Sequence, residues 1–239
     1  MLLKILTVII SLVVIGITYF YVDAQKDGPT PKSLAIKMVG ATGYVAVGVL
    51  CVLMTEELTQ FDKIMLGALI CSWIGDLFLH IRKPVICTGL GFMGFLSSHV
   101  CFILAYLNGI KVFNPDSKFI SLPEILTIAA ALIAFLVYIK IKKMSLPAII
   151  TVPVFIYGAV ITLMMCKAVI LGFTAFNSSV SPFVLVSSIL GALLFVMSDF
   201  SISILMFNQK QKKNFKLKLF NMYTFFAAEI LLASLIYFI

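Results

Sequence analysis

The stretch FVLVSSILGALLFVMSDFSISILMF, residues 183–207, carries only one charged residue, Asp199. About 20 predominantly apolar residues are enough for an α-helix to cross the hydrocarbon core of a bilayer. Seven more apolar segments of comparable length lie at 2–22, 33–54, 63–81, 87–107, 123–141, 146–170 and 217–238. The sequence therefore predicts an all-α integral membrane protein with eight transmembrane helices.

The composition supports a membrane protein rather than a soluble one. Of the 239 residues, 62% are hydrophobic and 12% are charged, and the mean hydropathy is +1.15. An ordinary soluble domain is about 45–50% apolar and about 25% charged. The connections between the apolar segments are short and leave no room for a sizeable extramembrane domain. We therefore expect residues 1–239 to form one polytopic membrane domain, with all eight helices in a single bundle.

The basic residues predict how the bundle is oriented in the membrane. The net charge is +8. Five basic residues lie on one side of the predicted bundle: Lys4, Lys63, Lys111, Lys118 and Lys167. Twelve lie in the connections on the other side: Lys26, Lys32, Arg82, Lys83, Lys140, Lys142, Lys143, Lys210, Lys212, Lys213, Lys216 and Lys218. Because cytoplasmic loops are enriched in Lys and Arg, both termini are expected on the non-cytoplasmic side. The expected partners of these charges are membrane lipids with anionic headgroups, and not nucleic acid.

Several common kinds of site have no signature in this chain. There is no HExxH, no G-x-S-x-G and no Gly-rich phosphate loop, and the glycines between Gly89 and Gly94 favour close helix packing. The five cysteines form no CxxC and are odd in number, which favours buried free thiols over disulfides or zinc. Neither a cofactor nor a metal is expected.

Once the residues near the ends of the spans are assigned to the connections, five ionisable residues remain inside the predicted spans and are the main candidates for function. They are Lys37, Asp76, His99, Asp199 and Glu229. A charged side chain in mid-membrane costs about 2.5–3.5 kcal/mol on insertion scales, so such residues face the bundle interior or a wet cavity. Their positions along the helices place Lys37, Asp76 and Asp199 in the cytoplasmic half and the other two near the middle. All five could line one cavity.

Each of the five also has a purely structural interpretation. Asp76 can form a buried pair with Lys37, or that lysine can snorkel to the interface. Asp199 can be satisfied by neighbouring hydroxyls, and His99 can be an interhelical hydrogen-bond donor. Glu229 can form hydrogen bonds in its protonated form.

The two aspartates give the sharper hypothesis. Of two buried carboxyls near each other, one can stay protonated as a general acid while the other stays ionised as a base. That arrangement suits acid-assisted addition of water. On this hypothesis Lys37 holds a phosphate or favours ionisation of one aspartate. His80 lies one turn after Asp76 but at the interface, where we expect it to be solvated.

Two motifs carry a resemblance to a known family. The stretch Trp73–Leu79 looks like the "GD" signature of the YhhN-like lysoplasmalogenases, and Gly191–Asp199 looks like their "GALLF-x-x-SD" signature. The resemblance covers about residues 36–235. Further matches fall in order at Ile36-Lys37, Phe95 to His99, Tyr157 with Met164, and Thr224–Glu229. Departures from the family pattern are Glu229 in place of Gln, Phe225 and Phe226 in place of Tyr, and Leu205 in place of Asn.

The resemblance implies a membrane hydrolase without a cofactor. Such an enzyme cleaves the vinyl-ether bond of a lysophospholipid, a lysoplasmalogen, to a fatty aldehyde and glycerophospho-ethanolamine or -choline. It implies Asp76 and Asp199 as catalytic residues. The implied substrate-binding or supporting residues are Lys37, His99, Tyr157, Ser198 and Glu229. The expected location is the endoplasmic reticulum in a eukaryote, or the inner or plasma membrane in a bacterium.

Other functions remain open at this point. Embedded carboxyls also serve as proton relays, so a proton-coupled transporter is the main alternative, although no internal repeat is visible and Pro147 and Pro153 fall in one segment only. A non-catalytic lipid-binding relative is another. A mechanistic variant has His99 and the two aspartates binding zinc.

Overall fold

The structure is a computed structural model that describes residues 1–26, 28–81, 84–144, 146 and 148–239. The described residues form eight helices, each long and apolar enough to cross a membrane. They are α1 (Leu2–Ala24), α2 (Pro31–Val52), α3 (Gln60–Ile81), α4 (Val85–Phe113), α5 (Leu122–Ile141), α6 (Ala148–Asn177), α7 (Pro182–Phe207) and α8 (Phe215–Phe238). The expected all-α, multi-pass membrane protein is confirmed. Arg82, Lys83 and Pro147 lie outside the described residues.

Local sequence signals set where the helices begin. At the start of α2, Pro31 takes the first position, and Thr30 and Ser33 form a capping box. At the start of α5, Glu124 reaches back to the backbone N–H of Ser121 at 2.7 Å. The side chain of Asn214 caps α8 by accepting from the backbone of Leu217. These contacts satisfy N–H groups that have no partner within the helix.

Two helices extend further than the apolar runs indicate. We expect the fourth span to end at residue 107 and the sixth at 170, but α4 continues to Phe113 and α6 to Asn177. In α4 the added turn buries Ile110. In α6 the added turns bury Leu171 and Ala175. The lengths of the apolar runs alone do not register buried residues beyond the expected ends.

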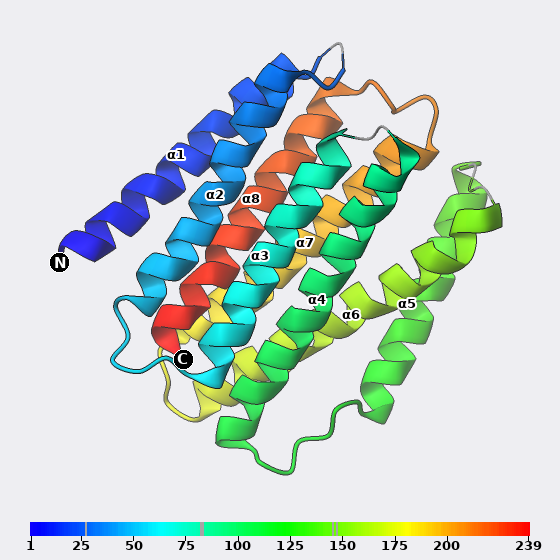
Figure 1. The fold of residues 1–239 in the computed structure, drawn as a ribbon. Helices are drawn as coiled ribbons and strands as arrows, with labels where there is room; N and C mark the ends of the chain where they lie inside the picture. The colour runs from blue at the N-terminus through cyan, green and yellow to red at the C-terminus, as the bar shows by residue number, and fades with distance from the viewer. Residues whose placement is uncertain (27, 82–83, 145, 147) are drawn as a thin grey trace.

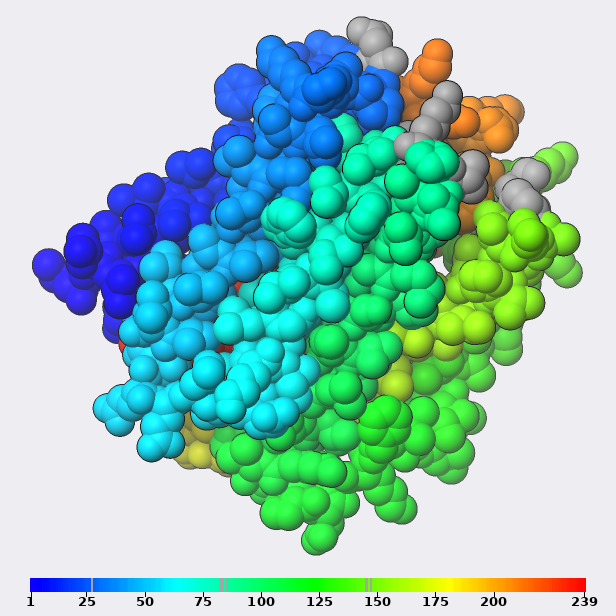
Figure 2. Space-filling model, viewed as in Figure 1, coloured from blue at the N-terminus to red at the C-terminus, as the bar shows by residue number. Residues whose placement is uncertain are grey.

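Helix α8 is the central element of the bundle. It packs against α1, α2, α3 and α7, and in Figure 2 its red C-terminal part shows only in small patches behind the blue and cyan helices. Helix α5 packs against α6 and lies at the periphery, while α1 forms the opposite edge (Figure 1). Both termini lie at the end of the bundle that carries the α2–α3, α4–α5 and α6–α7 connections (Figure 1).

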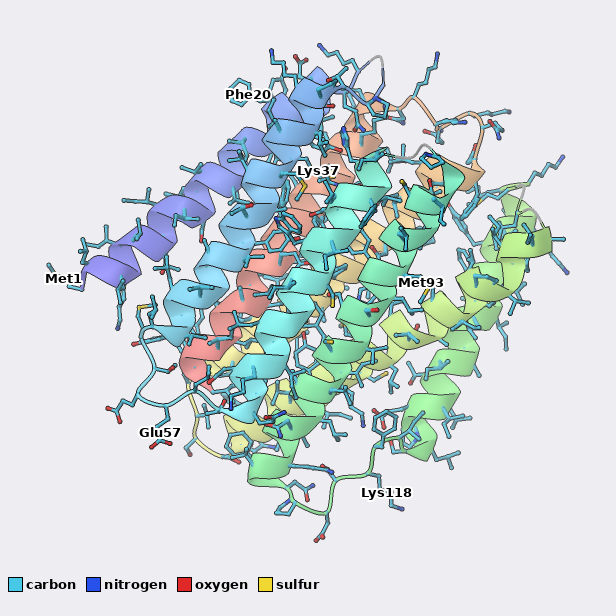
Figure 3. The ribbon with its side chains drawn as sticks, viewed as in Figure 1. Met1, Phe20, Lys37, Glu57, Met93 and Lys118 are labelled. Atoms are coloured by element: carbon cyan, nitrogen blue, oxygen red, sulfur yellow. The ribbon has the colours of Figure 1, made fainter. Side chains whose placement is uncertain are left out.

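The outer surface is apolar, as expected for a surface that faces lipid. Leu12 on α1 is 67% exposed and Ile149 on α6 is 86% exposed. Figure 3 shows Phe20 pointing away from the bundle, whereas Lys37 lies among the helices. The interior therefore contains the polar groups and the exterior the hydrocarbon side chains, as is typical of a membrane bundle.

Glycines bring α3 and α4 close together near the embedded residues. A Cβ added at Gly94 would lie 2.7 Å from the backbone nitrogen of Gly75, and one at Gly91 would lie 2.7 Å from that of Leu79. Only glycine permits this approach, so the expected packing role is confirmed for Gly91 and Gly94, whereas Gly89 has no atom of another helix within 4 Å of its added Cβ. The contact fixes α3, which carries Asp76, against α4, which carries His99.

Candidate functional site

Asp76 lies in a closed cluster with a lysine. Its Oδ1 is 2.8 Å from the Nζ of Lys37, which also donates to the Asp76 carbonyl at 3.1 Å. The Tyr44 hydroxyl donates to Oδ2 at 3.1 Å. The Asp76 side chain is only 2% exposed and that of Lys37 only 6%. The lysine is thus held in a buried ion pair, which matches the structural interpretation of Asp76 as the partner of Lys37.

Asp199 lies in a different cluster, formed by α4, α6 and α7. Its Oδ2 accepts from the Tyr157 hydroxyl at 2.6 Å and lies 3.0 Å from Nε2 of His99. Nε2 is also 2.9 Å from the Tyr157 oxygen, so three polar atoms form a triangle. On the far side of the ring, Nδ1 is 3.2 Å from the sulfur of Met164. The Asp199 side chain is 15% exposed, whereas the His99 side chain is fully buried.

The two aspartates do not contact each other. Helices α3 and α7 are not neighbours, because α8 lies between them and packs against both. Among the described residues, no hydrogen bond or ion pair joins Asp76 to Asp199. The five ionisable residues, which the sequence could place around one cavity, are thus divided in the structure. Four of them form two separate polar clusters, and Glu229 lies on α8 between the helices that carry the aspartates.

Glu229 is fully buried, as His99 is, and has the weakest contacts of the five. Neither carboxyl oxygen has a hydrogen-bond partner of good geometry among the described residues, although Ser72 is near enough to interact. The Ser72 hydroxyl is hydrogen-bonded to that of Ser98 at 2.7 Å. Glu229 lies on α8, which packs against both α3, the helix of Asp76, and α7, the helix of Asp199.

Aromatic rings fill the space between the two clusters. The ring of Tyr44 packs against that of Phe225, with the ring centroids 6.0 Å apart. The ring of Phe225 packs in turn against that of Phe195, with centroids 5.5 Å apart. The ring centroid of Phe195 lies 4.6 Å from that of His99. Phe225, which departs from the family tyrosine, therefore sits in the middle of the connection between the clusters and brings no hydroxyl there.

Ser198 holds α7 against α8 and does not contact Asp199. Its hydroxyl donates to the carbonyl of Asn221 at 3.2 Å. The side-chain amide of Asn221 donates in return to the Ser198 carbonyl at 2.7 Å. This reciprocal pair fixes the α7 turn that carries Asp199, so Ser198 supports the site through the backbone.

Two buried polar groups were missed or misplaced by sequence reasoning. His80 was expected to be solvated, and this is wrong, because it is buried with Nε2 3.1 Å from the Ser33 hydroxyl and Nδ1 3.3 Å from that of Tyr21. Lys167 was counted with the charges outside the spans, but it is buried in α6 and bound to Glu124. A polar residue one helical turn from another embedded one was the available signal for His80.

The residues suggested for a zinc variant are not grouped. His99 and Asp199 are in contact, but Asp76 belongs to the other cluster. In the part of the chain that the structure describes, no three His, Cys, Asp or Glu side chains lie close enough to hold a metal ion.

The comparisons with known proteins agree with the motifs. The model of the YhhN family matches residues 32–236, which is most of the chain and includes both aspartate clusters. No curated protein and no solved structure matched the chain. Because the family match covers far more than half of the sequence, the chain belongs to the YhhN family.

Proposed function

We propose that this protein is a membrane hydrolase that cleaves the vinyl-ether bond of lysoplasmalogens to a fatty aldehyde and glycerophospho-ethanolamine or -choline. The observation that carries the proposal is the triangle of His99, Tyr157 and Asp199, with contacts of 2.6–3.0 Å around a carboxyl that is partly exposed. Family membership, together with the resemblance to lysoplasmalogenases, supports the substrate class.

The chemistry needs a proton donor next to the alkenyl chain. Asp199 gives its proton to the β-carbon of the vinyl ether, and the π electrons form the new C–H bond. The resulting oxocarbenium ion takes up water, whose proton returns to the Asp199 carboxylate. The hemiacetal then breaks its bond to the glycerol oxygen, which takes the hydroxyl proton, and an aldehyde and an alcohol leave. A positioned proton donor of this kind contributes typically about 10²–10⁴-fold.

Asp76 acts in this proposal as a fixed negative charge. Its ion pair with Lys37 suits the role in which the lysine favours ionisation of one aspartate, and the phosphate role is left to other groups. From the adjoining cluster, a carboxylate stabilises the positive charge that develops on the substrate. The assignment gives the two aspartates separate tasks, with Asp199 as the acid.

The proposal includes an orientation in the membrane. The connections α1–α2, α5–α6 and α7–α8, taken together with the helix ends next to them, carry most of the described lysines. We therefore place this end of the bundle in the cytoplasm and both termini on the other side (Figure 1). Asp76 and Asp199 then lie in the half of the bundle nearer the cytoplasmic leaflet, from which the lysolipid would enter.

The decisive experiment offers vinyl-ether and ester lysolipids side by side to the purified protein and follows the products by mass spectrometry. We expect fatty aldehyde from the vinyl ether only, and its loss in Asp199→Asn and Asp76→Asn. The matched control is Asp116→Asn, at an exposed position in the α4–α5 connection. Absence of product in detergent, combined with proton movement across vesicles under a gradient, would instead identify a transporter.

A further inference from the structure

We propose that Met164 is a positioning residue that fixes the hydrogen of His99 on Nδ1, so that the His99–Asp199 pair must hold one transferable proton. This inference deepens the proposed function and rests on it for its catalytic meaning. Its structural part, the location of hydrogens in the triangle, can be measured without any substrate.

The first step concerns the contact between the thioether and the ring. The Met164 sulfur lies 3.2 Å from Nδ1, and both side chains are fully buried, so water does not separate them. A thioether sulfur carries no hydrogen and can only accept. If Nδ1 were unprotonated, two lone pairs would face each other at this distance. The contact is favourable only when Nδ1 carries a hydrogen and donates it to the sulfur.

The second step concerns the other ring nitrogen. With the hydrogen on Nδ1, a neutral imidazole has a lone pair on Nε2. This lone pair points to two oxygens, that of Tyr157 at 2.9 Å and Oδ2 of Asp199 at 3.0 Å. Those two oxygens are themselves 2.6 Å apart. Three close contacts therefore join three atoms, all of which can accept a hydrogen bond.

The third step counts the hydrogens that the triangle needs. The Tyr157 hydroxyl supplies one hydrogen, and it satisfies the short contact with Asp199. The contact between Nε2 and Oδ2 then requires a second hydrogen, because otherwise two acceptors would face each other in a buried site. That hydrogen belongs either to Asp199 as a neutral acid or to His99 as an imidazolium. In both cases the pair stores one proton that can leave, which is what an acid step requires.

Removing the sulfur changes where the hydrogen of His99 can lie. If Met164 accepts nothing from Nδ1, the neutral histidine can move its hydrogen to Nε2. This hydrogen alone then bridges the ring to an ionised Asp199, and the triangle is satisfied with no spare proton. Met164→Leu preserves size and apolarity but removes the acceptor. The matched control is Met165→Leu, because Met165 is the next residue on α6 and is only partly buried against the core.

The experiment uses the full chain in detergent micelles with isotope-labelled histidine. Only two histidines are present, and His80→Gln assigns the signals of the other. Nitrogen chemical shifts report which ring nitrogen of His99 carries hydrogen. We expect a protonated Nδ1 in the wild type and in Met165→Leu, and a shift of the hydrogen toward Nε2 in Met164→Leu. Where turnover is measured, kcat should fall by about 10-fold in Met164→Leu with KM unchanged.

The outcomes separate this inference from the proposed function. An unprotonated Nδ1 in wild-type His99, or a wild-type spectrum in Met164→Leu, overturns the role of Met164. The wild-type spectrum tests the idea even if the variant does not fold. The expected spectra in a protein that releases no aldehyde would support the hydrogen placement and reject the hydrolase assignment.

Discussion

The cluster around Asp76 and the cluster around Asp199 contain the same kind of residue at a similar depth in the bundle, yet they differ in chemistry. Asp76 is paired with a lysine and is nearly inaccessible. Asp199 is bonded to a tyrosine and a histidine, both of which can exchange protons, and is partly exposed. The partners of a buried carboxyl therefore decide whether it is a fixed charge or a proton donor.

The largest effect is expected for the partly exposed carboxyl. Asp199→Asn removes the transferable proton while preserving size and both hydrogen-bonding neighbours. We expect aldehyde release to fall by about 10³-fold, within the range found for a positioned acid. The melting temperature should stay close to that of the wild type, because no charge is left unpaired. A rate within 10-fold of the wild type would show that Asp199 is not the acid.

The closed cluster around Asp76 should lose stability as well as activity when it is disrupted. Asp76→Asn leaves the buried Lys37 without its counter-ion, and breaking a buried pair in this way costs about 3–5 kcal/mol. Unfolding followed by circular dichroism in detergent measures the loss. Adding Lys37→Met to the same chain should restore most of it, because the unpaired charge is removed. Equal stability of the wild type and Asp76→Asn would mean that the pair is solvated or already neutral.

A smaller loss of activity is expected when the Tyr157 hydroxyl is removed from the triangle and Asp199 is kept. Tyr157→Phe deletes the hydroxyl that donates to Asp199 at 2.6 Å but keeps the ring. This hydroxyl stabilises the carboxylate that forms as Asp199 gives up its proton. A hydrogen bond to a charged group contributes about 1.5–3 kcal/mol, so we expect kcat to fall by at least about 10-fold. The control is Tyr138→Phe on the neighbouring α5. The ring of Tyr138 packs against that of Phe200 on α7, with the ring centroids 4.9 Å apart, and lies outside the triangle. Equal losses in both variants would point to general loosening.

The sequence predicts the fold well because lipid imposes a simple rule on composition and length. All eight spans follow from apolar runs, and the five embedded residues follow from the cost of charge in hydrocarbon. The pairings of these residues do not follow, because the sequence of a helix that is apolar on every face does not show which face points into the bundle. Thus Lys37 with Asp76 was one interpretation among several, and the separation of Asp76 from Asp199 by α8 required three-dimensional packing.

Tyr157 and Met164 show a second limit. Neither is unusual in an apolar helix, so only the resemblance to a family singled them out. Their contacts with opposite sides of one histidine ring depend on how α6 is rotated against α4. Lys167 shows the reverse case, because its charge was visible but its buried partner on α5 was not.

The smallest effect is expected at Glu229, which lies between the two clusters. An ionised carboxyl there would be buried without a firm hydrogen bond and close to two other carboxyls, which is strongly unfavourable. A neutral Glu229 resembles glutamine in size and charge, so Glu229→Gln should change activity and melting temperature little, within about 3-fold in rate. Steady-state rates and thermal unfolding of this variant test the point. A loss of 100-fold or more in rate (about 2.7 kcal/mol) would mean that Glu229 passes protons between the clusters, and that the two aspartates act as one site after all.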